Sequence, residues 1–160
     1  MGEFFRSSPI ASKLLVIVHM LLGVGAVFGG FSLIIDTSGN LLKMPISLLK
    51  QSPFNDYLIP GIILLSLFGV VPLILAVALM KKWQWKAANK LNVFAEKHWS
   101  WTYSLYIGFA LIIWITLQVY FINDVHTVHL VYMAVGLAIQ ILTLLPGVQN
   151  YYVNEQTPAF

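Results

Sequence analysis

Four long runs of apolar residues, separated by short polar stretches, organise the chain. They cover Leu14–Ile35, Tyr57–Met80, Trp101–Ile122 and His126–Pro146. A helix needs about 20 apolar residues to cross the hydrocarbon core of a bilayer, and each run meets that length. Backbone polar groups in lipid must be paired, which only helices and closed β-barrels achieve. The runs lack the period-2 alternation of barrel strands, so they are helices. The predicted fold class is therefore all-α, a four-transmembrane-helix bundle.

The polar stretches predict two connections on one side of the membrane. Residues 36–40, Asp-Thr-Ser-Gly-Asn, have the composition of a turn, and so does Asn123-Asp124 between the third and fourth runs. Pro45–Lys50 mixes apolar and polar residues in the way of a short helix lying at the membrane interface. Residues 1–160 are thus expected to form a single membrane domain, with a short interfacial helix in its first outer loop.

Composition fits a membrane environment and excludes several classes of function. Hydrophobic residues make up 59% of the chain and charged residues 9%, whereas a soluble domain carries about 25% charged residues. The chain contains no cysteine. Disulfides and thiol redox chemistry are therefore excluded, and with them the four-helix redox proteins of the vitamin K epoxide reductase and DsbB types.

Basic residues are distributed unevenly between the two sides of the predicted bundle. Two of them, Lys43 and Lys50, lie on one side, and seven lie on the other: Arg6, Lys13, Lys81, Lys82, Lys86, Lys90 and Lys97. The positive-inside rule places the more basic side, with both termini and the middle loop, in the cytoplasm. Membrane lipids with anionic headgroups are the expected partners of these lysines. Nucleic acid is not an expected partner, because the positive-inside rule already accounts for the distribution of basic residues.

Ionisable residues inside membrane spans usually mark function, but no Asp, Glu, Lys or Arg lies within the four runs. A proton-coupled exporter of the small multidrug resistance type needs a mid-membrane carboxylate and is excluded. A haem bundle needs paired histidines, whereas His19 alone is deep, so no cofactor is expected.

Depth along the helices predicts an inner polar cluster of His19, Tyr106, Gln140 and Thr143 near the cytoplasmic ends. Two interpretations remain open for this cluster. It either fixes the bundle through interhelical hydrogen bonds or anchors a lipid or quinone headgroup.

Carboxylates and imidazoles gather at the opposite side: Asp36, Asp56 and Asp124 at helix ends, with His126 and His129 on one face of the fourth helix. These residues could ligate a divalent metal or form a pH-sensitive patch. Alternatively, the aspartates cap helices and turns.

Gly25 and Gly29, four residues apart, predict close packing of the first helix within the bundle or between copies. Pro72 lies mid-membrane and removes a hydrogen bond to the carbonyl of Phe68. It predicts a kink, which serves either packing or a hinge.

Three segments carry a resemblance to a known group of proteins: Asp-x-Ser-Gly at 36–39, Met44-Pro45, and Ser-Pro-Phe-Asn-Asp-Tyr-Leu-Ile-Pro-Gly at 52–61. Over the first two helices and their loop, the chain resembles small four-helix membrane proteins of Gram-positive bacteria. The resemblance implies a bacterial plasma membrane and no particular activity. A looser likeness, in architecture alone, is to the DoxX-like four-helix proteins.

The function expected from these features is non-enzymatic: an accessory or binding subunit that engages a partner membrane protein, a second copy or a lipid-like ligand. Two alternatives remain open. One is a transporter or channel-forming oligomer with Pro72 as hinge and Ser66 and Gln118 as lining groups. The other is a membrane-embedded metal-dependent enzyme that uses the outer aspartates and histidines.

Overall fold

All four apolar runs are helical in the computed structural model of the chain, which describes Phe4 and residues 8–154. The spans are α2 (Ile10–Ile35), a second span from Leu58 to Lys81, α6 (Trp99–Ile122) and α7 (Thr127–Leu144). Each is long and apolar enough to cross a membrane, so the chain is a multi-pass membrane protein and an all-helical bundle. The predicted fold class is confirmed.

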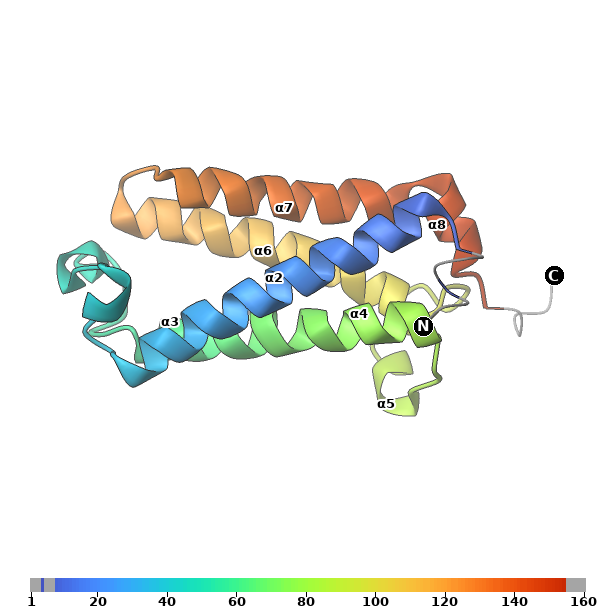
Figure 1. The fold of residues 1–160 in the computed structure, drawn as a ribbon, viewed down its shortest axis with the longest axis horizontal. Coiled ribbons are helices and arrows are strands. Elements are labelled where there is room, and N and C mark those ends of the chain that lie inside the picture. The colour runs from blue at the N-terminus through green and yellow to red at the C-terminus, as the bar shows by residue number, and fades with distance from the viewer. Residues whose placement is uncertain (1–3, 5–7, 155–160) are drawn as a thin grey trace.

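The four spans pair into two antiparallel hairpins (Figure 1). The first joins α2 to the second span and the second joins α6 to α7, while α2 crosses the bundle diagonally from α7 towards α3. We call the end with the 82–98 connection and the C-terminal segment the basic end. The other end, with the 36–57 loop and the 123–126 turn, is the hairpin end. The first residues of α2 and the last described residues both lie at the basic end.

Glycines bring α2 into close contact with the second span. A Cβ atom on Gly30 would lie 2.5 Å from the backbone nitrogen of Leu65, and one on Gly61 would lie 3.1 Å from the carbonyl oxygen of Gly30. Gly23 and Gly69 make a second close approach nearer the middle of the helices. Because lipid supplies no hydrophobic force between helices, such close backbone packing is a main source of their association.

The second span changes its hydrogen-bonding pattern midway. It consists of α3 (Leu58–Ile63), a π-helical segment η3 (Leu64–Val70) and α4 (Val71–Lys81), whose first turn contains Pro72. Proline lacks an N–H and crowds the carbonyl four residues earlier, and a wider π turn before it relieves that crowding. The disturbance predicted at Pro72 thus takes the form of a π-helical turn, and a hinge role stays a prediction.

Short helices complete the ends of the bundle. The interfacial helix predicted at Pro45–Lys50 is a 3-10 helix, η2 (Ile46–Leu49), preceded by η1 (Asn40–Leu42). At the basic end lie α5 (Lys86–Asn89) and α8 (Pro146–Tyr151). The fourth span was predicted to reach Pro146 but ends at Leu144. Leu145 is extended, as residues before proline tend to be, and Pro146 begins a new helix.

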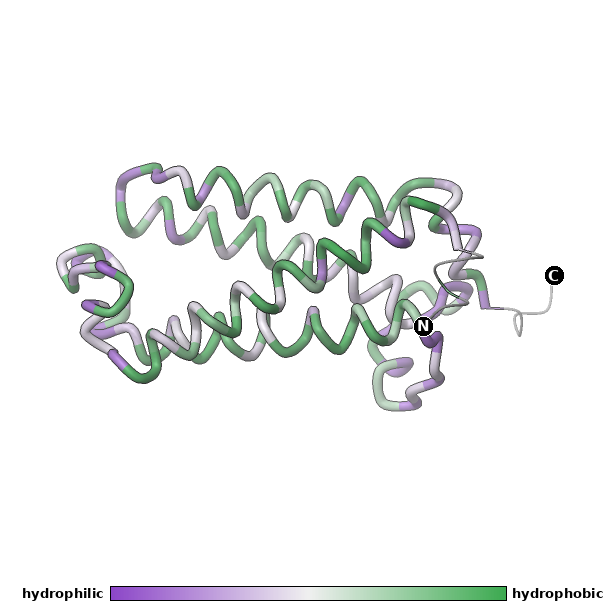
Figure 2. Tube along the Cα trace, in the orientation of Figure 1, coloured by the Kyte–Doolittle hydropathy of each residue, from purple (hydrophilic) through white to green (hydrophobic). Residues whose placement is uncertain are grey.

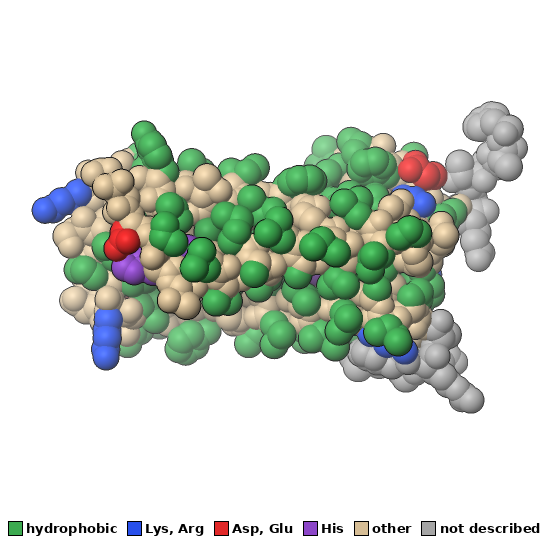
Figure 3. Space-filling view, turned by 90° about the horizontal axis from the view of Figure 1, so that it is seen from above, with side chains coloured by type: hydrophobic (Ala, Val, Ile, Leu, Met, Phe, Trp, Pro, Cys, Tyr) green, Lys and Arg blue, Asp and Glu red, His purple; other side chains and the backbone are tan. Residues whose placement is uncertain are grey.

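The sides of the bundle are apolar and its two ends are polar (Figures 2 and 3). Large apolar side chains in the middle of the spans are openly exposed, for example Leu21 at 70% and Phe28 at 71%. Exposure of this kind is unfavourable in water and is what contact with lipid tails requires.

Candidate functional site

The ribbons of the two hairpins diverge towards the hairpin end (Figure 1). Residues of both hairpins line a cavity there. Two pockets of about 200 and 60 Å³ make up this space. They share six lining residues: Leu33, Met44, Leu64, Trp114, Gln118 and Ile122. We call the two together the hairpin-end cavity. Leu48 and Leu49 of η2 border its end, so the 36–57 loop partly covers it.

Gly25 and Gly29 form part of the wall that α2 contributes to the cavity. The nearest atoms to a Cβ at these positions are the hydroxyl of Tyr132 and a methyl group of Leu64, each at 3.2 Å. These contacts are looser than those of Gly30 but still close, with Gly25 against α7 and Gly29 against the second span, so a packing role for this pair stays a prediction. The missing side chains of both glycines also leave space for the larger pocket.

Four side chains give the larger, mainly apolar pocket its hydrogen-bonding capacity: Trp114, Gln118, His129 and Tyr132. The indole N–H of Trp114 is buried and has no hydrogen-bond partner among the described residues. His129, only 6% exposed, accepts a hydrogen bond at Nδ1 from the backbone N–H of His126, 3.1 Å away. A ring nitrogen that accepts carries no proton, so Nε2 of His129 carries it and is a donor.

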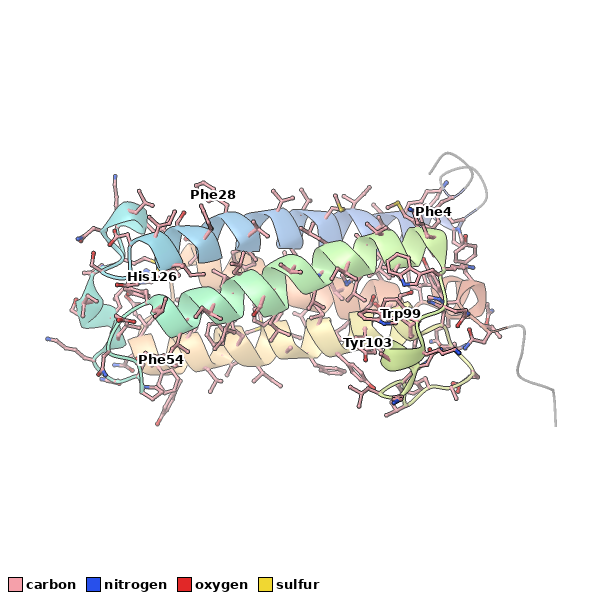
Figure 4. All side chains as sticks on the ribbon, turned by 90° about the horizontal axis from the view of Figure 1, so that it is seen from below. Phe4, Phe28, Phe54, Trp99, Tyr103 and His126 are labelled. Carbon is pink, nitrogen blue, oxygen red and sulfur yellow. The ribbon has the colours of Figure 1, made fainter. Side chains whose placement is uncertain are left out.

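The first turn of α7 is closed by its two histidines. The backbone N–H of His129 donates to the carbonyl oxygen of His126 at 2.9 Å, and the His129 side chain accepts from the backbone N–H of His126 at 3.1 Å. Nε2 of His126 lies 3.7 Å from Oδ2 of Asp124. Figure 4 shows His126 at the hairpin end of the bundle, on the same side as Phe54 of the long loop. Nδ1 of His129 is therefore committed to the first turn of α7.

The structure does not bring the five predicted outer-rim residues into a metal site. Asp36 accepts hydrogen bonds from Ser38 and from the backbone of Leu41, which closes the turn at the start of the long loop. Those hydrogen bonds lower the pKa of its carboxyl group. Asp56 accepts from the N–H of Leu58 at 2.9 Å and caps α3. Within the described residues, no three His, Asp or Glu side chains could share a metal ion.

The predicted inner cluster is divided by the structure. His19, Gln140 and Thr143 are buried, whereas the hydroxyl of Tyr106 donates to the carbonyl of Leu91 in the 82–98 connection. Gly25 of α2 and Tyr132 of α7 lie close together, which gives the two helices a common reference level. At a rise of 1.5 Å per residue, His19 lies about 9 Å and Gln140 about 12 Å nearer the basic end than this level. Because its hydroxyl bonds the 82–98 connection, Tyr106 does not share the interior position of the other three.

The three buried members bond mainly to backbone carbonyls. Nδ1 of His19 donates to Leu15, 2.9 Å away, and the amide of Gln140 donates to Leu105, also at 2.9 Å. The Thr143 hydroxyl bonds within its own helix. Nε2 of His19 and Oε1 of Gln140 are buried without a partner in the described part of the chain, and both are acceptors. Neither of the two pockets of the hairpin-end cavity is lined by these residues.

The lining groups proposed for a channel also separate. Gln118 faces the hairpin-end cavity. Ser66 is exposed on the outer surface of the second span, and its hydroxyl donates to the carbonyl of Ile62 at 2.7 Å. A single chain therefore does not place Ser66 and Gln118 along one path.

A network at the basic end ties the 82–98 connection to the C-terminal segment, and composition alone did not indicate it. The ammonium group of Lys82 donates to the carbonyl of Tyr151 at 2.6 Å and lies 3.4 Å from the centre of the Tyr151 ring. The hydroxyl of Tyr152 donates to the carbonyl of Leu79 at 2.9 Å. The carbonyls of Leu79 and Tyr151 lie in the last turns of α4 and α8, where no backbone N–H of the same helix is available to bond them. Two of the basic side chains, Lys82 and Lys97, thus donate hydrogen bonds to backbone carbonyls of the C-terminal segment.

His98 connects the same network to α6. One ring nitrogen donates to the carbonyl of Trp83 at 3.0 Å and the other accepts from Ser100, at the N-cap of α6. Trp99 donates to the same Trp83 carbonyl at 2.8 Å and, with Tyr103, fills the space above the connection (Figure 4). His98 is 3% exposed, and its burial lowers the pKa of the imidazole.

Lowering the pH is expected to destabilise the basic end through His98. Because the pKa of His98 is lower in the folded than in the unfolded chain, the unfolded chain binds the proton more readily, and stability falls as the pH drops below about 6.5. The unfolding temperature of the purified protein between about pH 7 and pH 5 should therefore decrease less in His98→Gln than in the wild type. An equal decrease in both would contradict this assignment.

No family model, curated protein or solved structure matches the chain. The class of the protein is therefore assigned from its fold and its cavity. The class that they define is an all-helical, multi-pass membrane protein of four spans in two hairpins. Within that class, this protein has a hydrogen-bonded basic end with an open polar pocket of about 640 Å³, and an apolar cavity between the hairpins at the other end.

Proposed function

We propose that the protein is a non-enzymatic binding subunit that holds a lipid-like molecule in the hairpin-end cavity. The observation that carries this proposal is an apolar cavity with a few polar groups, located between the two hairpins of the bundle, whereas the pocket at the basic end is open and polar. An apolar cavity of this kind favours an apolar guest over water.

We further propose a bacterial plasma membrane with the basic end in the cytoplasm. The distribution of lysine and arginine supports this orientation, since in sequence seven of the nine lie either before residue 14 or between residues 81 and 97. The hairpin end would then lie in the outer leaflet, and the ligand would come from that leaflet. The apolar outer surface is also compatible with binding to a partner membrane protein or to a second copy of the chain.

Filling the cavity is expected to remove the bound lipid. Gly29→Leu places a branched side chain against Leu64, in the wall of the cavity. Lipid that stays with the protein through purification, measured by extraction and mass spectrometry, should fall about tenfold, which corresponds to ~1.4 kcal/mol of binding free energy. Ala134→Leu is the matched control, because position 134 on α7 is exposed on the outside of the bundle and the same side chain there leaves the cavity open.

The comparison of the two variants decides the proposal. Equal lipid content in Gly29→Leu, Ala134→Leu and the wild type would show that the lipid is held on the outer surface. The proposal of an internal binding site would then be withdrawn.

A further inference from the structure

We infer that the ligand of the hairpin-end cavity has an uncharged head with carbonyl oxygens, as in an isoprenoid quinone or a diacylglycerol, and no phosphate. This inference rests on the proposed function and adds the class of ligand. Two properties of the cavity wall carry it: the direction of its hydrogen-bonding groups and its charge.

Two groups in the wall of the larger pocket, Trp114 and His129, offer only donors, while Gln118 and Tyr132 can both donate and accept. The indole N–H of Trp114 has no partner among the described residues. Nε2 of His129 is protonated because its Nδ1 accepts from the backbone. The hydroxyl of Tyr132 and the amide of Gln118 add two more donors, and each of these four residues lines the larger pocket. A buried donor without an acceptor costs about 1–3 kcal/mol, so a ligand that supplies acceptor oxygens relieves a cost already present.

The polar side chains of the wall are uncharged. The lining of both pockets consists of apolar residues with serine, glutamine, tyrosine, tryptophan and a neutral histidine. The basic residues nearest in sequence to the lining, Lys43 and Lys50, are exposed to solvent and line neither pocket. Asp124 lies beside His126 at the start of α7, and a carboxylate there repels an anion. A phosphate in this cavity would be buried without a cation, which is strongly unfavourable, whereas quinone and ester carbonyls need only donors.

The test uses three probes with the delipidated protein in detergent: dioleoylglycerol, a short-chain isoprenoid quinone and dioleoylphosphatidylglycerol. Dioleoylglycerol and dioleoylphosphatidylglycerol share their acyl chains, so their ratio in native mass spectrometry isolates the effect of the headgroup. We expect at least one neutral probe to bind about tenfold more than the phospholipid. The two neutral probes distinguish a quinone from a glycerolipid as the source of the carbonyl oxygens.

Two variants connect this preference to the wall. The double variant Gln118→Leu with Tyr132→Phe removes two donors and keeps the shape, so the preference for the neutral probe should fall several-fold. Gly29→Leu should reduce the binding of every probe, and Ala134→Leu should change none. Unfolding temperatures measured without lipid confirm that each variant is folded.

The outcomes separate this inference from the proposed function. If the phospholipid binds as well as the neutral probes and Gly29→Leu removes it, the cavity binds lipid but the inference about the headgroup is wrong. An unchanged preference in the double variant also overturns the inference. If none of the probes depends on position 29, the proposed function fails as well.

Discussion

Gly30→Ala is expected to destabilise the protein strongly, although it adds a single methyl group. That methyl would lie 2.5 Å from the backbone nitrogen of Leu65 and 2.8 Å from the carbonyl oxygen of Gly61. Backbone atoms cannot turn away as a side chain can, so α2 and the second span must separate. Overpacking of this kind costs about 1–3 kcal/mol, and the rigid neighbours place Gly30→Ala at the upper end of that range.

The adjacent glycine provides the control for this experiment. A methyl group at position 29 meets only a side-chain methyl of Leu64 at 3.2 Å, so Gly29→Ala should leave the unfolding temperature nearly unchanged. Thermal unfolding of both variants in the same detergent measures the difference. If the two variants unfold at the same temperature, the glycine contact between α2 and the second span does not hold the first hairpin together.

Tyr152→Ala is expected to have the largest effect of any change at the basic end. Tyr152 is fully buried, its hydroxyl bonds the carbonyl of Leu79, and its own carbonyl accepts from the N–H of His98 at 2.7 Å. Removing a buried aromatic side chain costs about 3–5 kcal/mol. The variant should yield little folded protein, with a C-terminal segment that proteases cleave readily.

Conservative changes at the two neighbouring tyrosines separate packing from hydrogen bonding. Tyr152→Phe leaves the Leu79 carbonyl without its donor and should cost about 1–3 kcal/mol. Tyr151 is half-buried and has no hydroxyl bond among those in the described residues, so Tyr151→Phe should be nearly neutral. Similar stability of the two phenylalanine variants would show that the hydroxyl of Tyr152 does not cap α4.

The overall fold could be predicted because membrane insertion depends on length and hydropathy, which a single sequence displays directly. The interfacial helix at Ile46–Leu49 followed in the same way from local composition. Which glycines make the shortest contacts could not be predicted. Gly25 and Gly29 fit the small-residue spacing, but the helix face that meets the second span depends on the diagonal path of α2, and the shortest distances to that span are at Gly23 and Gly30.

The candidate site was predicted only in part, for a similar reason. His129 and Gln118 were noticed as polar residues, yet their presence in one cavity depends on how far the two hairpins separate, a long-range property. The inner cluster was predicted from depth alone, and depth does not fix the direction of a side chain. Tyr106 has a depth similar to that of Gln140 but its hydroxyl bonds Leu91 in the 82–98 connection.

The most direct measurement of the central claim is a density map of the full chain in lipid nanodiscs. We expect elongated density that the chain does not account for, lying between α2 and α6 at the hairpin end and in contact with Trp114 and Gln118. Hairpins closed upon each other at that end, with Leu33 and Leu64 packed against Ile122 and no space between them, would contradict the proposal of an internal lipid-binding site.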